Sequence, residues 1–280
     1  MRALTFLASR FVAGDDVGDA IAAVRALNES GIKATLDNLG EDSLTRAQAS
    51  AAADENLRML RRIADVGVDC NISLKLTQIG LAIDESLARE NLIKIASEAA
   101  RLKNFVRVDM ESSAWTQKTL DLFYSLHGKF PDMGIVLQAS LRRTEADCRD
   151  AAARGVRVRL CKGAYKEPAD VAFPSKADVN ANYDRCAAIL TKAPVPAFAT
   201  HDDARIEAAL TACDAAGLVK TDYEIQMLYG LRAKRWHELR AQGHTVRIYV
   251  PYGSHWFPYF YRRIRERKEN LLFVVRNLWE

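Results

Sequence analysis

The feature that most constrains the fold is a regular alternation between short β-rich runs and longer segments with helical periodicity. Eight β-rich runs recur along the chain, at residues 34–41, 70–80, 104–113, 134–140, 156–164, 196–202, 223–228 and 246–253. Parallel strands cannot be joined by a tight turn and need a crossover of helix length, which the spacing of these runs supplies. The pattern therefore predicts repeated βα units in one parallel sheet.

Several of the intervening segments have apolar residues at spacings of three and four, which is typical of amphipathic helices. These segments are residues 45–66, 84–102, 115–130 and 144–154. Thr45, Asp84 and Thr144 stand at three of their starts and are suited to cap the first turn. The remaining expected elements are a helix before the first strand at 17–30, an eighth helix at 256–267 and a C-terminal extension at 269–279.

Eight such units favour a closed (βα)8 barrel of the TIM type over an open doubly wound sheet. An open sheet of that kind has fewer strands and usually carries a glycine-rich phosphate loop after its first strand. Neither GxGxxG nor GxxxxGK[ST] occurs in the sequence. The 280 residues contain no linker or low-complexity tract, so we expect a single domain spanning residues 1–280.

Composition excludes several functional classes. The 40 Lys and Arg residues against 36 Asp and Glu give a mild net charge of +4, spread along the chain, which argues against nucleic-acid binding. The five cysteines form no CxxC pair, so we expect neither a disulfide framework nor a metal site, and a cytoplasmic location.

No run approaches the ~20 apolar residues that cross a bilayer, so any membrane contact is expected to be peripheral. The first eleven residues, MRALTFLASRF, precede Gly14 and two aspartates without an evident small-residue cleavage site. A helix packed on the domain is therefore favoured there over a signal peptide.

Polar residues at the carboxyl ends of the strands are of functional interest, because the active site of a (βα)8 enzyme lies at that end. The candidates are Asn38, Glu41, Lys75, Thr77, Gln78, Asp109, Glu111, Gln138, Arg159, Lys162, Thr200, His201, Asp202, Gln226, Tyr249 and Tyr252. We expect these side chains to converge.

Lys75 stands in an otherwise aliphatic run, where an unpaired ammonium would be costly. One interpretation is a buried ion pair with Asp109 or a neighbouring carboxylate. The functional interpretation, a ligand for a substrate carboxylate, includes such a pair. Asp109 could merely cap the next helix, but its valine neighbours place it on a buried face.

The run RLCKGAY, residues 159–165, ends a strand with two cations and a Gly-Ala turn. Backbone amides and positive charge then converge, as an anion or a cofactor phosphate requires; the alternative is a solvated basic strand end. His201 has no second His or Cys at metal-ligand spacing. We therefore expect it to hydrogen-bond a ring or phosphate rather than zinc.

The last segment places Tyr259, Arg262, Arg263 and Glu266 on one face of the helix expected from Trp256. Two arginines beside an aromatic ring suit a bidentate grip on a small carboxylate. The alternative is a solvated basic helix end, which the helix dipole would favour.

Motifs from all of these segments stand in a recognisable order. They are LDNLGE, LKLTQIG, RVDME, VLQA, RLCKGAY, FATHD, EIQMLYG, RIYVPYG and YFYRRIRER. Together they resemble the proline dehydrogenase family, in particular its short monofunctional bacterial members, over residues 10–277. The resemblance implies a (βα)8 flavoenzyme that oxidises L-proline to Δ1-pyrroline-5-carboxylate with FAD, the first step of proline catabolism to glutamate, and passes the electrons to a quinone.

The resemblance also implies a functional pairing with a pyrroline-5-carboxylate dehydrogenase. The length leaves room for neither a fused aldehyde dehydrogenase module nor a DNA-binding segment, so we expect a monofunctional enzyme.

Roles of individual residues follow from the same resemblance. Lys75, Arg262 and Arg263 would pair with the proline carboxylate, and Asp109 would order the polar network near the flavin. The residues that would pack around the pyrrolidine ring are Leu228, Tyr249 and Tyr259.

The resemblance implies a set of FAD contacts as well. These are Gln138, Arg159, Lys162, Gly163, Ala164, Thr200, His201 and Gln226. Glu41 would pair with Arg263 as a gate over the substrate. The chain departs from the family at Ser140, Cys161 and Asp202, which stand where an aromatic, an aliphatic and an Asn residue are common; these departures bear on flavin affinity rather than on the reaction.

Three alternatives stay open. Hydroxyproline oxidation would need a smaller polar residue in place of Tyr249. A non-catalytic flavin or amino-acid-binding barrel would lack the cationic clamp, whereas Lys75, Arg262 and Arg263 are all present. A phosphate-binding aldolase-type barrel could use Lys75 as a Schiff base and would have no flavin to bleach.

Overall fold

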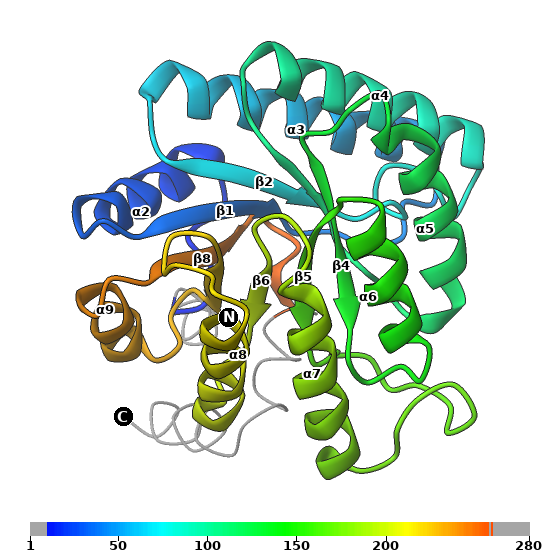
Figure 1. The fold of residues 1–280 in the computed structure, drawn as a ribbon. Coiled ribbons are helices and arrows are strands. Elements are labelled where there is room, and N and C mark those ends of the chain that lie inside the picture. The colour runs from blue at the N-terminus through cyan, green and yellow to red at the C-terminus, as the bar shows by residue number, and fades with distance from the viewer. Residues whose placement is uncertain (1–9, 258, 260–280) are drawn as a thin grey trace, which may run out of the picture.

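A ring of helices surrounds a central barrel of strands in the computed structural model, which describes residues 10–257 and 259 (Figure 1). Eight parallel strands close the barrel in chain order, and the last pairs with the first. They are β1 Lys33–Asn38, β2 Cys70–Leu74, β3 Val106–Val108, β4 Met133–Gln138, β5 Arg157–Cys161, β6 Ala197–Ala199, β7 Glu224–Leu228 and β8 Thr245–Tyr252. The predicted (βα)8 barrel is confirmed.

Among the described residues, one helix precedes β1, and one follows each strand from β1 to β7. They are α2 Val17–Glu29, α3 Arg46–Val66, α4 Glu85–Arg101, α5 Ser113–His127, α6 Thr144–Ala153, α7 Lys176–Leu190, α8 Asp203–Ala215 and α9 Ala233–Ala241. The helix predicted at 256–267 and the extension at 269–279 fall outside the described residues, apart from residues 256, 257 and 259. The same holds for most of the helix predicted over the first eleven residues.

Side-chain caps set the start of several helices. At α3, Thr45 accepts from the backbone N–H of Gln48 and the Gln48 side chain accepts from that of Thr45, which is a capping box. Asp84 caps α4. The prediction of Thr144 as a cap is wrong: it is the first residue of α6, and its hydroxyl donates instead to the Gln138 carbonyl at the end of β4.

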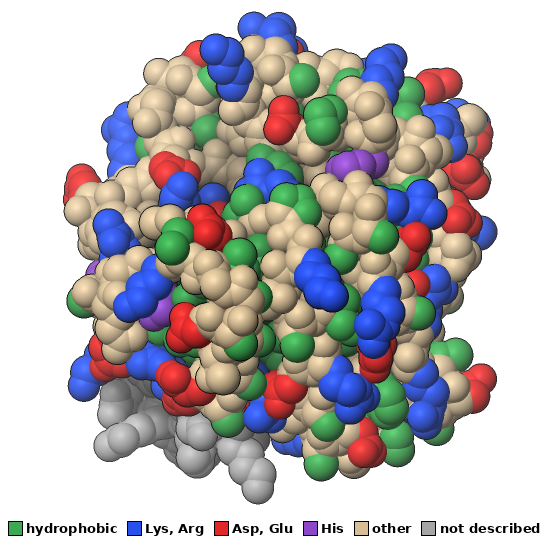
Figure 2. Space-filling view, in the orientation of Figure 1, with side chains coloured by type: hydrophobic (Ala, Val, Ile, Leu, Met, Phe, Trp, Pro, Cys, Tyr) green, Lys and Arg blue, Asp and Glu red, His purple; other side chains and the backbone are tan. Residues whose placement is uncertain are grey.

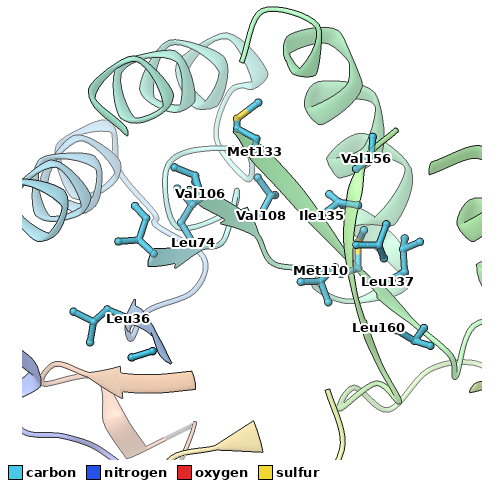
Figure 3. Close-up of a cluster of buried hydrophobic side chains, with 14 of the residues drawn as sticks. Leu36, Leu74, Val106, Val108, Met110, Met133, Ile135, Leu137, Val156 and Leu160 are labelled. Carbon is cyan, nitrogen blue, oxygen red and sulfur yellow. The ribbon is translucent and has the colours of Figure 1, made fainter. Parts of the chain in front are cut away.

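The main hydrophobic core lies between the barrel and the helices. Figure 3 shows part of it, with side chains of β1 to β5 such as Leu36, Leu74, Val106, Ile135 and Leu160, all fully buried. Alternate residues of a strand point to opposite faces, so one aliphatic set from each strand covers the helix side. Burying each such side chain stabilises the fold by about 1.5–3 kcal/mol.

The barrel interior is polar, whereas barrels of this type are typically filled with branched aliphatic residues. The buried polar residues at its inward positions are Thr35, Asp37, Asn71, Ser73, Arg107, Arg159, Glu224, Gln226 and Arg247. A buried polar group needs a partner to offset its lost hydration, so these side chains must satisfy one another.

Some candidate site residues lie just beyond strands that end earlier than predicted. β1 ends at Asn38, so the prediction that Glu41 ends the first strand is wrong; polar residues after the strand extended its apparent length. Lys75 and Asp109 directly follow β2 and β3. All of these residues still lie at the carboxyl end of the barrel, where the active site was expected.

The surface in view in Figure 2 carries Lys and Arg side chains intermixed with Asp and Glu, without a field of one sign. Across the described part of the chain, no helix combines the length and the apolar character needed to cross a membrane. Within the same residues, no group of three or more His, Cys, Asp or Glu side chains is placed to hold a metal ion.

Candidate active site

A cavity of about 1030 Å³ opens at the carboxyl ends of the strands. Of the strand-end candidates, Asp202 also lines it, whereas Asn38, Thr77, Gln78, Glu111 and Tyr252 do not. The lining includes every described residue to which the sequence gave a specific role in the site. These are Glu41, Lys75, Asp109, Gln138, Arg159, Lys162, Gly163, Ala164, Thr200, His201, Gln226, Leu228, Tyr249 and Tyr259. The remaining two, Arg262 and Arg263, lie outside the described residues. The barrel therefore brings these positions together, while their individual roles stay predictions.

Lys75 lies between two carboxylates. Its Nζ is 3.3 Å from Asp37 Oδ2 and 3.6 Å from Asp109 Oδ2, and its side chain is 10% exposed. Burial alone would lower the pKa of Lys75, but the two carboxylates outweigh it and raise that pKa above its usual value. Lys75 is therefore held as an ammonium, which suits it to bind a carboxylate and not to form a Schiff base, because that reaction needs the neutral amine.

Asp109 is the centre of a hydrogen-bonded cluster. Its Oδ1 accepts from Arg159 Nη1 at 2.9 Å and from Ser73 Oγ at 2.6 Å, and its Oδ2 accepts from the Tyr249 hydroxyl at 2.9 Å. Burial, with Asp109 beside it, raises the pKa of Tyr249 well above its usual value, so the hydroxyl stays a donor. Asp109 does not cap the next helix, whose N-cap is Ser112.

A chain of hydrogen bonds runs from Asp109 down the barrel interior. Arg159 Nε donates to Gln226 Oε1 at 2.7 Å, and Gln226 Nε2 donates to Glu224 Oε2 at 2.6 Å. Glu224 in turn is bound by Arg247 with Nη2 at 2.9 Å and Nε at 3.0 Å. Hydrogen bonds to Asp109 and to Gln226 thus hold the Arg159 side chain in place at the cavity floor.

The cavity wall at β5 and β6 combines positive charge with a close backbone approach. Gly163 has φ +107°, and a Cβ there would lie 2.2 Å from Ser140 Oγ, so a larger residue would not fit. Lys162 Nζ is 2.6 Å from Asp202 Oδ2, and Asp202 also caps α8. The lysine is therefore partly neutralised by the Asp202 carboxylate.

His201 and Leu228 link the ends of β6 and β7. The Leu228 backbone N–H donates to His201 Nε2 at 3.0 Å. A ring nitrogen that accepts a hydrogen bond carries no proton, so the other nitrogen, Nδ1, holds the proton of the neutral ring. Nδ1 is thus a donor, as the expected contact with a ring or phosphate requires.

The family model for proline dehydrogenase matches residues 20–276. The chain belongs to the proline dehydrogenase family. Proline dehydrogenase 2 of Bacillus subtilis is 38% identical over 272 residues, which cover 97% of this chain and 90% of that protein. The proline dehydrogenase of Deinococcus radiodurans is 38% identical over 278 residues, with the same shares covered. The resemblance inferred from the motifs is confirmed.

A solved structure of proline utilization A from Bdellovibrio bacteriovorus superimposes with a TM-score of 0.88 at 24% identity. The match covers 93% of this chain and 32% of that one. The barrel of this proline dehydrogenase family member therefore has the fold of about one third of that larger protein.

Two buried carboxylates of this proline dehydrogenase family member received no role from the sequence. Asp37, the closest partner of Lys75, is fully buried in β1. The sequence pattern does indicate Asp37 as a candidate, because Thr35 and Asp37 alternate with Leu36 and therefore lie on the opposite face of the strand from that aliphatic residue. Glu111 was noted at a strand end, and its carboxylate accepts from the Thr77 backbone N–H at 3.1 Å and from the Thr77 hydroxyl.

We expect Glu111 to make stability fall as the pH rises through the weakly acidic range. Burial raises the pKa of Glu111 from 4.5 to about 7, against the opposing effect of its hydrogen bonds from Thr77. Between these values the unfolded chain has lost the proton and the folded chain keeps it, so the free energy of unfolding falls by up to about 1.4 kcal/mol per pH unit. Urea denaturation at several pH values should show this fall weakened in Glu111→Gln. Equal pH dependence in both proteins would contradict the assignment.

Proposed function

We propose that this protein oxidises L-proline to Δ1-pyrroline-5-carboxylate with non-covalently bound FAD and passes the electrons to a quinone. The observation that carries the proposal is the cavity in which Lys75, kept cationic by two carboxylates, shares one space with Arg159, Lys162 and the Gly163 turn. Lys75, which can bind a substrate carboxylate, thus lies next to a cavity wall whose cations and backbone amides suit a phosphate-bearing cofactor.

The cavity fits FAD in size and in chemistry. Ligand pockets commonly span about 300–1000 Å³, and this one has about 1030 Å³. Gly163 lines the cavity at φ +107°, a backbone conformation that favours glycine, and without a side chain it leaves the backbone of this turn open to a ligand. The residues that would hold the cofactor are Gln138, Arg159, Lys162, Gly163, Ala164, Thr200, His201 and Gln226. When bound, FAD supplies an electron sink for the hydride from the ring carbon beside the proline nitrogen.

The side chains of this protein bind and orient the substrate. The cluster of Asp37, Asp109, Lys75 and Arg159 contains two acids and two cations, so it balances itself and offers little net charge to a carboxylate. Arg262 and Arg263 would add the positive charge that holds the proline carboxylate together with Lys75.

An aromatic and apolar wall would fix the proline ring. The Tyr249 ring is immobilised because its hydroxyl is anchored on Asp109. Together with Leu228 and Tyr259, which also line the cavity, it would set the ring for hydride loss.

An absorbance spectrum of the purified protein tests cofactor and substrate together. We expect the two visible bands of an oxidised flavin, bleached by L-proline under anaerobic conditions and restored by a water-soluble quinone. Hydroxyproline should bleach the bands far more slowly, because Tyr249 fills the space that the ring hydroxyl would need. A colourless protein that takes up no FAD, or bands that L-proline leaves unchanged, would overturn the proposal.

The electrons and the product each need a recipient. We propose a quinone as electron acceptor, reached by peripheral contact with a membrane or in solution in the cytoplasm. The product would be consumed by a pyrroline-5-carboxylate dehydrogenase acting as a functional partner.

Glu41 is expected to act as a gate residue with Arg263. Glu41 is half-buried at the cavity, in the loop after β1, and β1 pairs with β8 along its whole length. The loop after β1 therefore adjoins the chain that leaves β8 toward Arg263. An ion pair between the two residues would close the site against water during hydride transfer.

Glu41→Ala should lower kcat/KM for proline several-fold while FAD content and melting temperature stay nearly the same. The double variant with Arg263→Ala should lose less than the sum of the single losses. Steady-state kinetics of the four proteins measure this. Wild-type kinetics in Glu41→Ala, or strictly additive losses, would leave Glu41 as a carboxylate without a gating role.

A further inference from the structure

We propose that the opposite end of the barrel, at the amino ends of the strands, holds a binding site for a small oxyanion such as inorganic phosphate. A second cavity of about 410 Å³ opens there. Its lining comes from the starts of β2 and β5, the turn before β3, and β8, and includes Asn71, Lys103, Asn104, Arg157 and Arg247. The charged lining residues are three cations, Lys103, Arg157 and Arg247, and one carboxylate, Asp69, a balance that suits an oxyanion.

Positive charge exceeds negative charge at this end of the interior. Arg107, Arg157 and Arg247 meet one buried carboxylate, Glu224, whose two oxygens are already used by Arg247 and Gln226. Asp69 lies at the cavity rim, exposed, and is 3.3 Å from Lys33. Asp132, exposed before β4, also attracts Arg157 electrostatically, so Glu224 is the one buried carboxylate among the described residues that the three guanidinium groups share.

Arg157 is the guanidinium at this end without a hydrogen-bonded partner among the described residues, although Glu224 and Asp132 attract it electrostatically. Within the described residues its guanidinium makes no hydrogen bond or ion pair, and its Nε is buried. Arg107, 1% exposed, likewise has an Nε without a partner among the described residues. Burial lowers the pKa of both arginines, and an anion bound in the cavity against Arg157 would offset this cost at Arg157.

The arginines are held in position by dedicated packing. Phe105 stacks against both: Arg107 Cζ lies 4.7 Å and Arg157 Cζ 4.1 Å from its ring centroid. Gly134 in β4 makes room for Arg107 and Phe105, since a Cβ there would lie 2.6 Å from both Arg107 Nη1 and the Phe105 ring and 2.5 Å from the Arg157 carbonyl oxygen. Arg107 Nη1 donates to the Arg157 carbonyl at 2.8 Å, whereas the Arg157 guanidinium makes no hydrogen bond to another described residue, so the N–H groups of Arg157 suit the two-pronged contact that oxyanions accept.

A purely structural role accounts for Arg247, which is saturated by Glu224 and the Ala34 carbonyl. It accounts less fully for Arg157, whose side chain packs on Phe105 but makes no hydrogen bond to another described residue, and which lines the cavity. The proposed site is distinct from the active-site cavity and lies at the other end of the barrel, so it does not depend on the function proposed above.

Thermal melts and isothermal titration of the FAD-loaded protein with inorganic phosphate test the site, at constant ionic strength set with sodium chloride. We expect one phosphate per chain and a saturable rise in melting temperature of about 2–4 °C at ten times the dissociation constant. Arg157→Gln should abolish both signals. Arg25→Gln, which removes an exposed arginine of α2, should keep them.

A third variant separates the two ends of the barrel. Lys162→Gln, measured with FAD in excess, should still bind phosphate; loss of binding there instead of in Arg157→Gln would place the anion in the active-site cavity and overturn the proposal. If titration of the wild-type protein with phosphate released or absorbed no heat, that result alone would overturn the proposal. An equal rise in melting temperature in wild type and Arg157→Gln would do the same.

Discussion

Replacing Lys75 by methionine is expected to lower kcat/KM for L-proline by about 10- to 150-fold, which corresponds to one charge-assisted contact of about 1.5–3 kcal/mol. The variant removes the cation that the proline carboxylate would contact and leaves Asp37 and Asp109 facing each other without it. Repulsion between the two carboxylates should then make one of them take up a proton, which adds a pH dependence that the wild-type enzyme lacks.

Steady-state kinetics and inhibition by small carboxylates measure this effect. Lys118→Met, at an exposed position of α5, is the matched control and should leave both unchanged. An unaltered KM together with unaltered carboxylate inhibition in Lys75→Met would remove Lys75 from the substrate site and leave it as part of a structural ion pair.

Glu224→Gln should lower the free energy of unfolding by about 3–5 kcal/mol, the usual cost of breaking a buried pair from one side. The change keeps the shape of the side chain but removes the carboxylate that Arg247 binds with two nitrogens. Arg107, Arg157 and Arg247 then share the barrel end without a buried counter-charge. Urea denaturation of the FAD-loaded protein measures the loss.

The free energy of unfolding of Glu224→Gln should also depend less on pH than that of the wild type between pH 4.5 and about 2. Burial opposes ionisation of Glu224, but Arg247 outweighs it and lowers the pKa from 4.5 to about 2. The pair therefore stabilises the fold above pH 4.5, and this contribution is lost as the pH falls toward 2. Asp150→Asn, which breaks an exposed pair with Arg154, should change stability little. A similar small loss in Glu224→Gln would show that the interior is hydrated enough to replace the carboxylate.

The barrel was predictable because its signal is repeated. Each unit alternates a β-rich run with an amphipathic segment, and both periodicities arise from burial against the same layer of helices and strands. The ends of the elements were less predictable. β2 stops at Leu74 although aliphatic residues continue to Leu81, because those residues pack in the turn that leads to α4. Hydrophobicity marks burial and does not distinguish a strand from a buried turn.

The site was predictable to the extent that its residues follow strands. Lys75 and Asp109 drew notice as charges in apolar runs, and the structure places them 3.6 Å apart. Asp37 did not, because contact between side chains of different strands depends on register, which a single sequence does not reveal. The alternation Thr35, Leu36, Asp37 did contain the information that the inward face of β1 is polar.

The polar barrel interior has a consequence for how this protein can be altered. The Gln226 amide must present its oxygen to Arg159 and its nitrogen to Glu224, because the reverse would set donor against donor and acceptor against acceptor. Each member of the line thus dictates the chemistry of the next. We expect single substitutions at these positions to destabilise the protein, whereas paired substitutions that restore the match of donor and acceptor should be tolerated. The aliphatic face toward the helices depends on volume and shape, and it should accept single swaps between aliphatic residues of similar volume.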